Sequence, residues 1–277
     1  MNNEIEISPL YTKLVLEIEA IRKEYSILWE EKDRLENQLK PLLLIKFNLE
    51  LGHTILAYMN MHLYFLKLKR KIELLQMHIN QNRQVNMNEI ESSLYAEFQE
   101  WISQISKLEK DIRVARQTTF DFLKPEDSIR LQEIYRKLVR ILHPDLNKNI
   151  TENQKILWNR VQDAYKNLDL EGLLNLEILA GSEELISEIS SLEVLTKKKD
   201  KLWNQFQILT KSVDEVKKSF PLDLERELDD PEWIKRESGL YQNKTKEIES
   251  LLPQYEKIYK DILFQLYGLM QEHPENL

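Results

Sequence analysis

Apolar residues recur at helical spacing along most of the chain, without the alternation that marks β-strands. From residue 18 to residue 42 the apolar positions follow alternating steps of three and four residues, which is the spacing of a coiled-coil seam. The pattern predicts a helix from Pro9 to about Lys40, capped by Ser8 and kinked before Pro41. Its seam positions are Ile18, Ile21, Tyr25, Leu28, Lys32, Leu35, Leu39 and Leu42.

Two further apolar segments, separated by a polar loop, predict an antiparallel helical hairpin. The first should run from about Leu42 to Ile79, with an apolar face broad enough for more than one neighbour. The Asn-rich segment 80–88 predicts a loop, and a returning helix should follow it. The seam of this returning helix is Leu94, Phe98, Trp101, Ile105, Leu108, Ile112 and Ala115. We therefore expect a coiled-coil hairpin in the N-terminal part of the chain.

Two shorter helices joined by a tight loop are predicted in the middle of the chain. The first should span residues 127–142, and His143-Pro144-Asp145 ends it. The second should span residues 151–167, because Thr151 and Gln154 have the spacing of a capping box.

The last third of the chain predicts further helices. Asp169 can cap a short helix that ends near Gly181, and a long helix should occupy residues 182–220. Pro231 and Pro253 can each stand near the start of a further helix. The 182–220 helix and the N-terminal helix both emerge near the central pair, and their matched seams give the hypothesis that they pack together, which the sequence alone does not decide. The fold class is therefore all-α, with an N-terminal coiled-coil hairpin (1–121), a central domain (122–181) and a C-terminal helical region (182–277).

The composition agrees with long solvated helices and narrows the possible partners. Of 277 residues, 42% are hydrophobic and 31% are charged, and only 5 are glycine. The net charge of −8 argues against a nucleic-acid-binding protein, so the basic cluster at 67–71 is interpreted as solvated surface. The chain has no cysteine, which excludes disulfides, thiolate zinc sites and cysteine nucleophiles and fits a reducing cytoplasm.

The sequence does not support a membrane protein, a metal-binding protein or an enzyme. Polar residues interrupt the apolar stretch 42–68 too often for a membrane span, and the first residues lack the features of a signal peptide. His53, His62 and His78 do not share a helical face with carboxylates at ligand spacing. No nucleotide-binding or hydrolase motif is present. We therefore expect a cytoplasmic protein that is not an enzyme and takes no cofactor.

The segment from Tyr135 to Asn147 is the most informative, because a basic helix ends there in His143-Pro144-Asp145. Proline restrains its own backbone and that of the residue before it, so His143 and Asp145 should be held in a preset orientation. Asp145 would offer an anionic acceptor to a cationic donor on a partner. Apolar stripes at helical spacing should join the two central helices. The stripes are Ile134, Leu138, Ile141 and Leu142 on one helix, and Trp158, Val161 and Tyr165 on the other.

This segment resembles the second helix and following loop of the DnaJ, or J-domain, family. The shared pattern is an aromatic residue, two basic residues, leucine and then His-Pro-Asp; in the next helix Trp158, Val161, Ala164 and Tyr165 match the family's Phe, Ile, Ala and Tyr. The resemblance implies that a DnaK-type ATPase chaperone docks on the loop and the basic helix, and that the loop triggers ATP hydrolysis. The residues implied in chaperone binding are Arg136, Lys137, Arg140, His143, Pro144, Asp145 and Asn147. The residues implied in the domain core are Tyr135, Leu138, Leu142, Trp158, Val161, Ala164 and Tyr165.

The chain also departs from the family pattern. Leu146 stands where the family commonly has lysine, and the family's first helix, with its Tyr-x-x-Leu-Gly pattern, is absent. We expect residues 116–123, at the end of the hairpin, to take its place. The family's Gly/Phe-rich linker, zinc module and β-rich substrate domains are missing as well.

Two functional hypotheses follow. The first is a J-domain co-chaperone that recruits a DnaK-type ATPase to an unknown client or complex held by coiled-coil arms. The second is a structural adaptor that kept a J-like fold and lost the coupling to an ATPase. The seams could pair within one chain or between two, so a homodimer stays open. Neither a membrane nor a nucleic-acid partner is expected.

Overall fold

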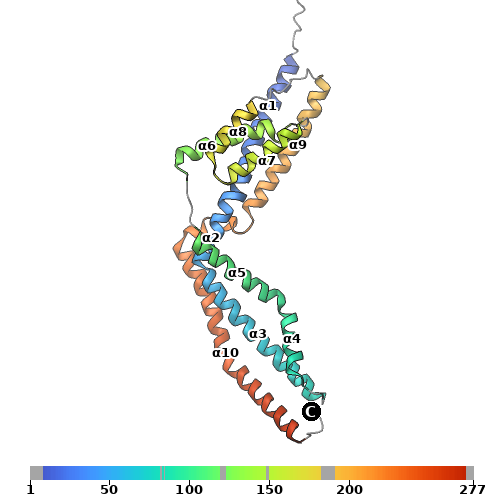
Figure 1. Cartoon of the computed structure of the whole chain (residues 1–277), viewed down its shortest axis with the longest axis vertical. Coiled ribbons are helices and arrows are strands. Elements are labelled where there is room, and N and C mark those ends of the chain that lie inside the picture. Colours follow the sequence, from blue (N-terminus) through green and yellow to red (C-terminus); the bar gives the residue numbers. More distant parts are fainter. Residues whose placement is uncertain are drawn as a thin grey trace, which may run out of the picture. The chain divides into compact units, whose positions relative to one another are not determined.

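The computed structural model describes residues 9–81, 83, 85–118, 123–147, 150–181 and 191–272. These residues form helices joined by turns, and no strand occurs among them (Figure 1). The predicted all-α fold class is therefore confirmed.

The helices gather into two compact units, each assembled from segments that are distant in sequence. The first unit comprises Met1–Leu43 and Thr119–Leu224, and the second comprises Leu44–Thr118 and Glu225–Leu277. These units cross the boundaries of the three consecutive domains expected from the sequence. The N-terminal helix packs with the central helices, and the C-terminal helix packs with the hairpin.

In the first unit, α1 (Pro9–Arg34) lies beside α9 (Leu192–Lys217), as Figure 1 shows. Ion pairs join the two helices, from Lys199 to Glu17 at 3.0 Å and from Lys217 to Glu31 at 2.7 Å. The expected packing of these helices is confirmed. The described part of α9 begins after Ser191, whose hydroxyl accepts from the backbone of Val194; the start expected at Ser182 lies outside the described residues.

A π-helical turn, η1 (Leu35–Leu39), joins α1 to α2 (Lys40–Glu50). The irregularity lies just before Pro41, near the predicted kink. Pro41 has no N–H to donate to the carbonyl of Asn37, and its ring crowds that carbonyl, so the regular ladder is interrupted there.

The remaining helices of the first unit form what we call the central module: α6 (Pro125–Leu142), α7 (Glu152–Lys166) and α8 (Leu170–Gly181). Each packs on the other two, and α1 packs on α6. Both caps predicted for this module are present, whereas the cap predicted at Ser8 lies outside the described residues. Thr151 and Gln154 form a capping box, and the carboxylate of Asp169 accepts from the backbone N–H of Gly172 at 2.8 Å.

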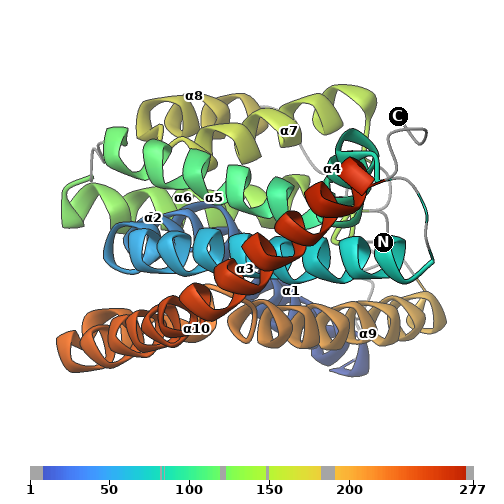
Figure 2. The same ribbon diagram turned by 90° about the horizontal axis from the view of Figure 1, so that it is seen from below.

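The second unit contains α3 (Gly52–Asn80), α4 (Met87–Glu97), α5 (Gln99–Gln117) and α10 (Pro231–Glu272). Helices α4 and α5 return along α3, and α10 crosses α3 (Figure 2). Short 3₁₀ turns at Leu222–Leu224 (η2) and Glu227–Asp229 (η3) precede α10. The core shared by α3, α4 and α10 is Leu68, Ile72, Leu75, Ile90, Leu94, Ile262 and Leu266.

The hairpin is more broken than predicted. The helix expected from 42 to 79 is interrupted at Leu51, and the returning helix is interrupted at Phe98. Gly52 explains why α3 can approach α5 so closely, because a Cβ there would lie 2.8 Å from Cγ1 of Ile112. Coiled-coil packing within this hairpin stays a prediction.

The prediction of a new helix near Pro253 was wrong, because Pro253 lies inside the continuous α10. Proline removes one helical hydrogen bond. Packing on either side outweighs that loss: Leu252 and Ile258 pack against the core, and the ring of Tyr255 meets that of Phe65 at 5.0 Å between centroids.

Within the part of the chain that the structure describes, no single helix is both long and apolar enough to cross a membrane. One bent pair, residues 9–50 with 52–80, meets that measure by length and composition alone.

Candidate functional site

The loop after α6, residues 143–147, adopts a hydrogen-bonded turn. The backbone N–H of His143 still donates to the carbonyl of Val139 at 2.9 Å, while its own φ and ψ of −67° and 129° are extended. A residue that precedes proline is confined to this region. Pro144 therefore ends α6 at a defined point.

Bonds to His143 hold the turn closed. Its carbonyl accepts from the backbone N–H groups of Leu146 and Asn147, both at 3.0 Å. Its ring Nδ1 accepts from the backbone N–H of Asp145 at 3.1 Å. Since Nδ1 is an acceptor, the ring proton of the neutral imidazole belongs on Nε2.

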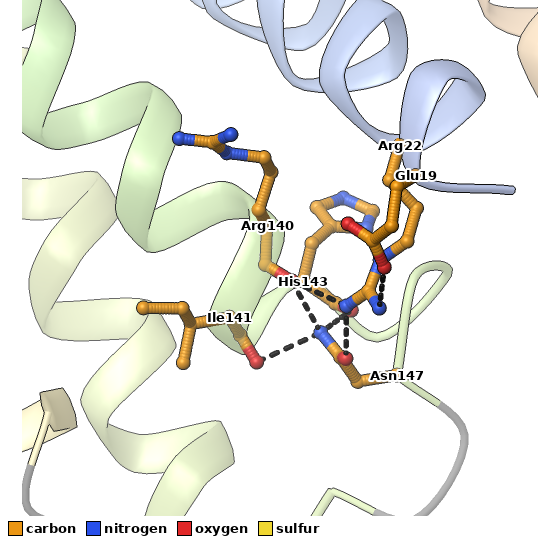
Figure 3. Close-up of polar contacts among 6 residues, drawn as sticks. All are labelled: Glu19, Arg22, Arg140, Ile141, His143 and Asn147. Atoms are coloured by element: carbon orange, nitrogen blue, oxygen red, sulfur yellow. Dashed lines mark hydrogen bonds and ion pairs between the residues drawn. The ribbon is translucent and has the colours of Figure 1, made fainter. Parts of the chain in front are cut away.

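The side chain of Asn147 fastens the loop to the end of α6. Its amide nitrogen donates to the carbonyls of Arg140 at 3.0 Å, Ile141 at 2.7 Å and His143 at 3.3 Å (Figure 3). The carbonyls of Arg140 and Ile141 lie in the last turn of α6 and lack the usual backbone donor four residues later, because residue 144 is proline and the N–H of Asp145 donates to the ring of His143. Asn147 was predicted as a chaperone-binding residue, which stays a prediction; its contacts within the chain show that it shapes the loop.

The ring of His143 is buried, with 4% of the residue exposed. It packs against Trp29 at 4.0 Å, Trp158 at 5.1 Å and Tyr25 at 5.5 Å between ring centroids. Burial lowers the pKa of His143 to about 4, so the imidazole is neutral near pH 7.

Pro144 and Asp145, by contrast, are exposed. The Oδ2 atom of Asp145 accepts from the hydroxyl of Tyr25 at 2.8 Å. Burial and this bond to the carboxylate both raise the pKa of Tyr25 above its ordinary value, so the hydroxyl keeps its proton and remains a donor. Among the described residues, no donor is bound to the other carboxylate oxygen of Asp145.

Helix α1 reaches the loop through a third side chain, Arg22. Its guanidinium donates to the carbonyl of Arg140 and to Oδ1 of Asn147, both at 2.9 Å, and to Glu19 at 3.2 Å. Figure 3 shows Arg22 pointing from α1 at Asn147, while the guanidinium of Arg140 points away from this cluster. We call Arg22, Tyr25 and Trp29 the α1 cover.

A buried polar cluster continues along α1 beyond the cover. The carboxylate of Glu30, whose side chain is 3% exposed, accepts from the Tyr165 hydroxyl and from Arg136 at 2.9 and 3.2 Å. Asp33 accepts from the Tyr135 hydroxyl, and burial raises the pKa of this carboxyl. The rings of Tyr135 and Tyr165 stack at 3.9 Å. Polar bonds therefore contribute a large share of the contact between α1 and the central module.

The basic residues of α6 have different surroundings. Arg136 is turned toward Glu30 of α1, whereas Lys137 pairs with Glu177 of α8 at 2.6 Å and keeps 54% of its side chain exposed. Arg140 is half-buried, and its guanidinium points away from the loop. Because exposed ion pairs contribute little, Lys137 can exchange Glu177 for another anion at small cost.

The residues predicted for the core of the module are mostly buried together. Among them Tyr135, Leu138, Leu142, Trp158, Val161 and Tyr165 are buried, and Ala164 is half-buried. Leu146 is only 4% exposed. A lysine at that position would carry its ammonium into an apolar site, which gives a physical reason for leucine there.

The contribution of α1 was missed in the sequence. Residues 116–123 were expected to replace a missing first helix, but α5 ends at Gln117 within the second unit, and residues 119–122 lie outside the described residues. From outside the central module, α1 is a helix that packs on α6. Glu30 and Asp33 of α1 are buried, and no signal in the sequence indicated it, because charged residues in an amphipathic helix are normally assigned to its solvent-facing side.

Two other candidates can be assessed. In the basic cluster, Arg70 pairs with Glu73 and Glu97, and Lys71 pairs with Glu91; its interpretation as solvated surface stays a prediction. No group of three or more histidine or carboxylate side chains that could hold a metal ion occurs among the described residues.

Comparison with protein-family models, with curated proteins and with solved structures finds no match to this chain. The site therefore has to be interpreted from its own geometry.

Proposed function

We propose that this chain is a co-chaperone whose central module binds a DnaK-type ATPase chaperone and stimulates its ATP hydrolysis. The observation that carries the proposal is the 143–147 loop, a turn held in one shape at the end of a basic helix, with Pro144 and Asp145 exposed. A loop that is already ordered loses less entropy on docking than a mobile one.

The charges around the loop favour a partner whose surface carries a cationic donor beside an acidic strip. No described residue donates to the second carboxylate oxygen of Asp145, so a cationic donor on a partner could bind it. A charge-assisted bond of that kind is roughly twice as strong as a neutral one. Lys137 and Arg130 are exposed on α6 and suit an acidic strip on the same partner. In this proposal the chain carries out no chemistry itself, and the ATPase performs the reaction.

Recruitment of a client or complex by the helical arms, in the cytoplasm, belongs to the same proposal. The long helices α3 and α10 of the second unit offer an extended surface for it.

One observation favours a second candidate, an adaptor without ATPase coupling. Helix α1 already contacts His143, Asp145 and Asn147, so the loop serves the packing of its own unit. An adaptor would need nothing more from it.

An ATPase assay separates the two candidates. Stimulation of phosphate release by a DnaK-type chaperone is measured for the native chain and for Asp145→Asn, which keeps an oxygen acceptor for Tyr25 and removes the charge. A second variant, Lys137→Glu with Arg140→Glu, reverses the basic face of α6. The matched control is Lys155→Glu on α7, an exposed lysine that pairs with Glu152, three residues before it.

The co-chaperone proposal predicts stimulation by the native chain and by the Lys155 control, with a loss of about tenfold or more in both loop and basic-face variants. If neither the native chain nor variants that weaken the contact of α1 with the loop stimulate the ATPase, the adaptor is the better account. Equal stimulation by Asp145→Asn would show that the loop is not the docking site.

A further inference from the structure

We infer that α1 is a releasable cover of the docking loop, and that the central module engages the ATPase only when residues 22–30 leave the 143–147 loop. This inference rests on the proposed function and adds its regulation. It concerns a contact within the first unit, between α1 and the end of α6.

The first argument is overlap. Helix α1 already holds three side chains of the loop: the ring of His143 lies against Trp29, Oδ2 of Asp145 is bound to Tyr25, and Oδ1 of Asn147 is bound to Arg22. With α1 in place, a partner can reach Asp145 through its other carboxylate oxygen, but not these three groups. A partner that uses these groups cannot bind them while α1 is bound to them.

The second argument is charge. Glu30 gives Arg136 an anionic partner, and Glu177 does the same for Lys137. A carboxylate on the ATPase would compete with Glu30 for the same guanidinium. Helix α1 thus already presents to α6 the negative charge that the proposed partner would present.

The third argument is that the contact is suited to opening. The buried residues of α1 are Leu14, Ile18, Tyr25, Ser26, Glu30 and Asp33, and half of them are polar. Polar groups regain water when they separate, so their net contribution is smaller than that of apolar burial over the same area. Moreover, Nε of Arg22 is buried without an acceptor among the described residues, and release would hydrate it.

The contact of α1 with α9 would survive such a movement. Glu17 and Glu31 pair with lysines of α9, and neither touches the loop. Release is therefore a local separation of the cover from the 143–147 loop, and α1 stays paired with α9.

Opening can be measured without any partner, because the chain has no cysteine. Leu146 is buried in the loop at 4% exposure, so Leu146→Cys introduces a single thiol whose labelling rate reports loop opening. The rate is compared in four backgrounds: native α1, Arg22→Ala, the milder Tyr25→Phe, and the control Glu17→Gln, which weakens the pairing with α9 and leaves the cover intact. Circular dichroism of each variant establishes that α-helix content is retained.

The same α1 variants, without the cysteine, are then titrated in the ATPase assay. The inference predicts that Arg22→Ala raises the labelling rate and lowers the half-maximal concentration for ATPase stimulation by about tenfold each, with Tyr25→Phe between it and the native chain. Glu17→Gln should match the native chain in both measurements.

Three outcomes would overturn the inference. If labelling is equally slow in all backgrounds, α1 is not released. A second outcome is that Arg22→Ala opens the loop, while the native chain and this variant stimulate the ATPase fully and equally. In that case the proposed function stands and α1 does not regulate it. If the loop opens and no background stimulates the ATPase, the proposed function itself fails.

Discussion

Removal of the buried carboxylate of Glu30 should strongly destabilise the first unit. In Glu30→Ala, the hydroxyl of Tyr165 loses its acceptor inside the protein, and Arg136 loses its anion. An orphaned buried hydroxyl costs about 1–3 kcal/mol, and breaking a fully buried ion pair costs about 3–5 kcal/mol. Because the side chain of Arg136 is 34% exposed and water partly replaces its partner, we expect a total of about 3 kcal/mol.

Two companion variants test the origin of that loss. Glu30→Gln keeps an oxygen for Tyr165 and removes the charge, so it should cost about half as much as the alanine variant. Tyr165→Phe removes the hydroxyl that Glu30→Ala leaves unpaired. The double variant should therefore be less destabilised than the sum of the single ones, by about 1–2 kcal/mol.

The assay is equilibrium unfolding in urea, followed by tryptophan fluorescence and by circular dichroism so that the two units can be resolved as separate transitions. The transition of the second unit should not move. A loss below about 1 kcal/mol in Glu30→Ala, or strict additivity with Tyr165→Phe, would refute the assignment of Glu30 as the shared buried acceptor.

Three further changes have defined outcomes. Burial lowers the pKa of His143 from 6.5 to about 4 in the folded chain, so the unfolded chain takes up the proton at a higher pH than the folded chain. The free energy of unfolding should therefore be unaffected above pH 6.5 and should fall by up to about 3 kcal/mol between pH 6.5 and 4. In His143→Asn, which does not titrate, the urea midpoint should lack this part of the pH dependence. Gly52→Ala should destabilise the second unit by about 1–3 kcal/mol in urea because its Cβ meets Ile112, whereas the control Gly239→Ala, with open space around it, should be neutral or stabilising. Asp169→Ala should cost about 1 kcal/mol through loss of the α8 cap, and a thermal melt that is unchanged would contradict that role.

The local features of the fold could be predicted because their causes are local. The cap at Thr151 depends on residues three positions apart, and the stripe of Trp158, Val161 and Tyr165 depends on helical periodicity. By the same logic the end of α6 at His143 follows from Pro144.

The cover over the loop could not be predicted in this way. Arg22 and Tyr25 meet Asn147 and Asp145 across separations of 125 and 120 residues, and no rule of spacing connects them. The pattern of hydrophobic and polar positions also assigns a charged residue such as Glu30 to the solvent-facing side of the helix. A buried carboxylate is nevertheless stable where donors such as Tyr165 and Arg136 are bound to it.

The errors at Leu51 and Pro253 have a related origin. A local signal gives the intrinsic cost of a break or a proline, and tertiary packing decides whether the helix tolerates it. Leu51 is buried where the chain changes direction next to Gly52, and Pro253 stays helical because α10 packs along α3.

The most direct test of the account is a hydrogen-exchange footprint of the native chain, alone and with an ATP-bound DnaK-type chaperone. The account predicts that amides of the 143–147 loop and of the following start of α7 gain protection, while amides of α1 from Arg22 to Glu30 lose it as the cover is displaced. Protection confined to the second unit, or a loop and α1 that exchange identically with and without the chaperone, would contradict it.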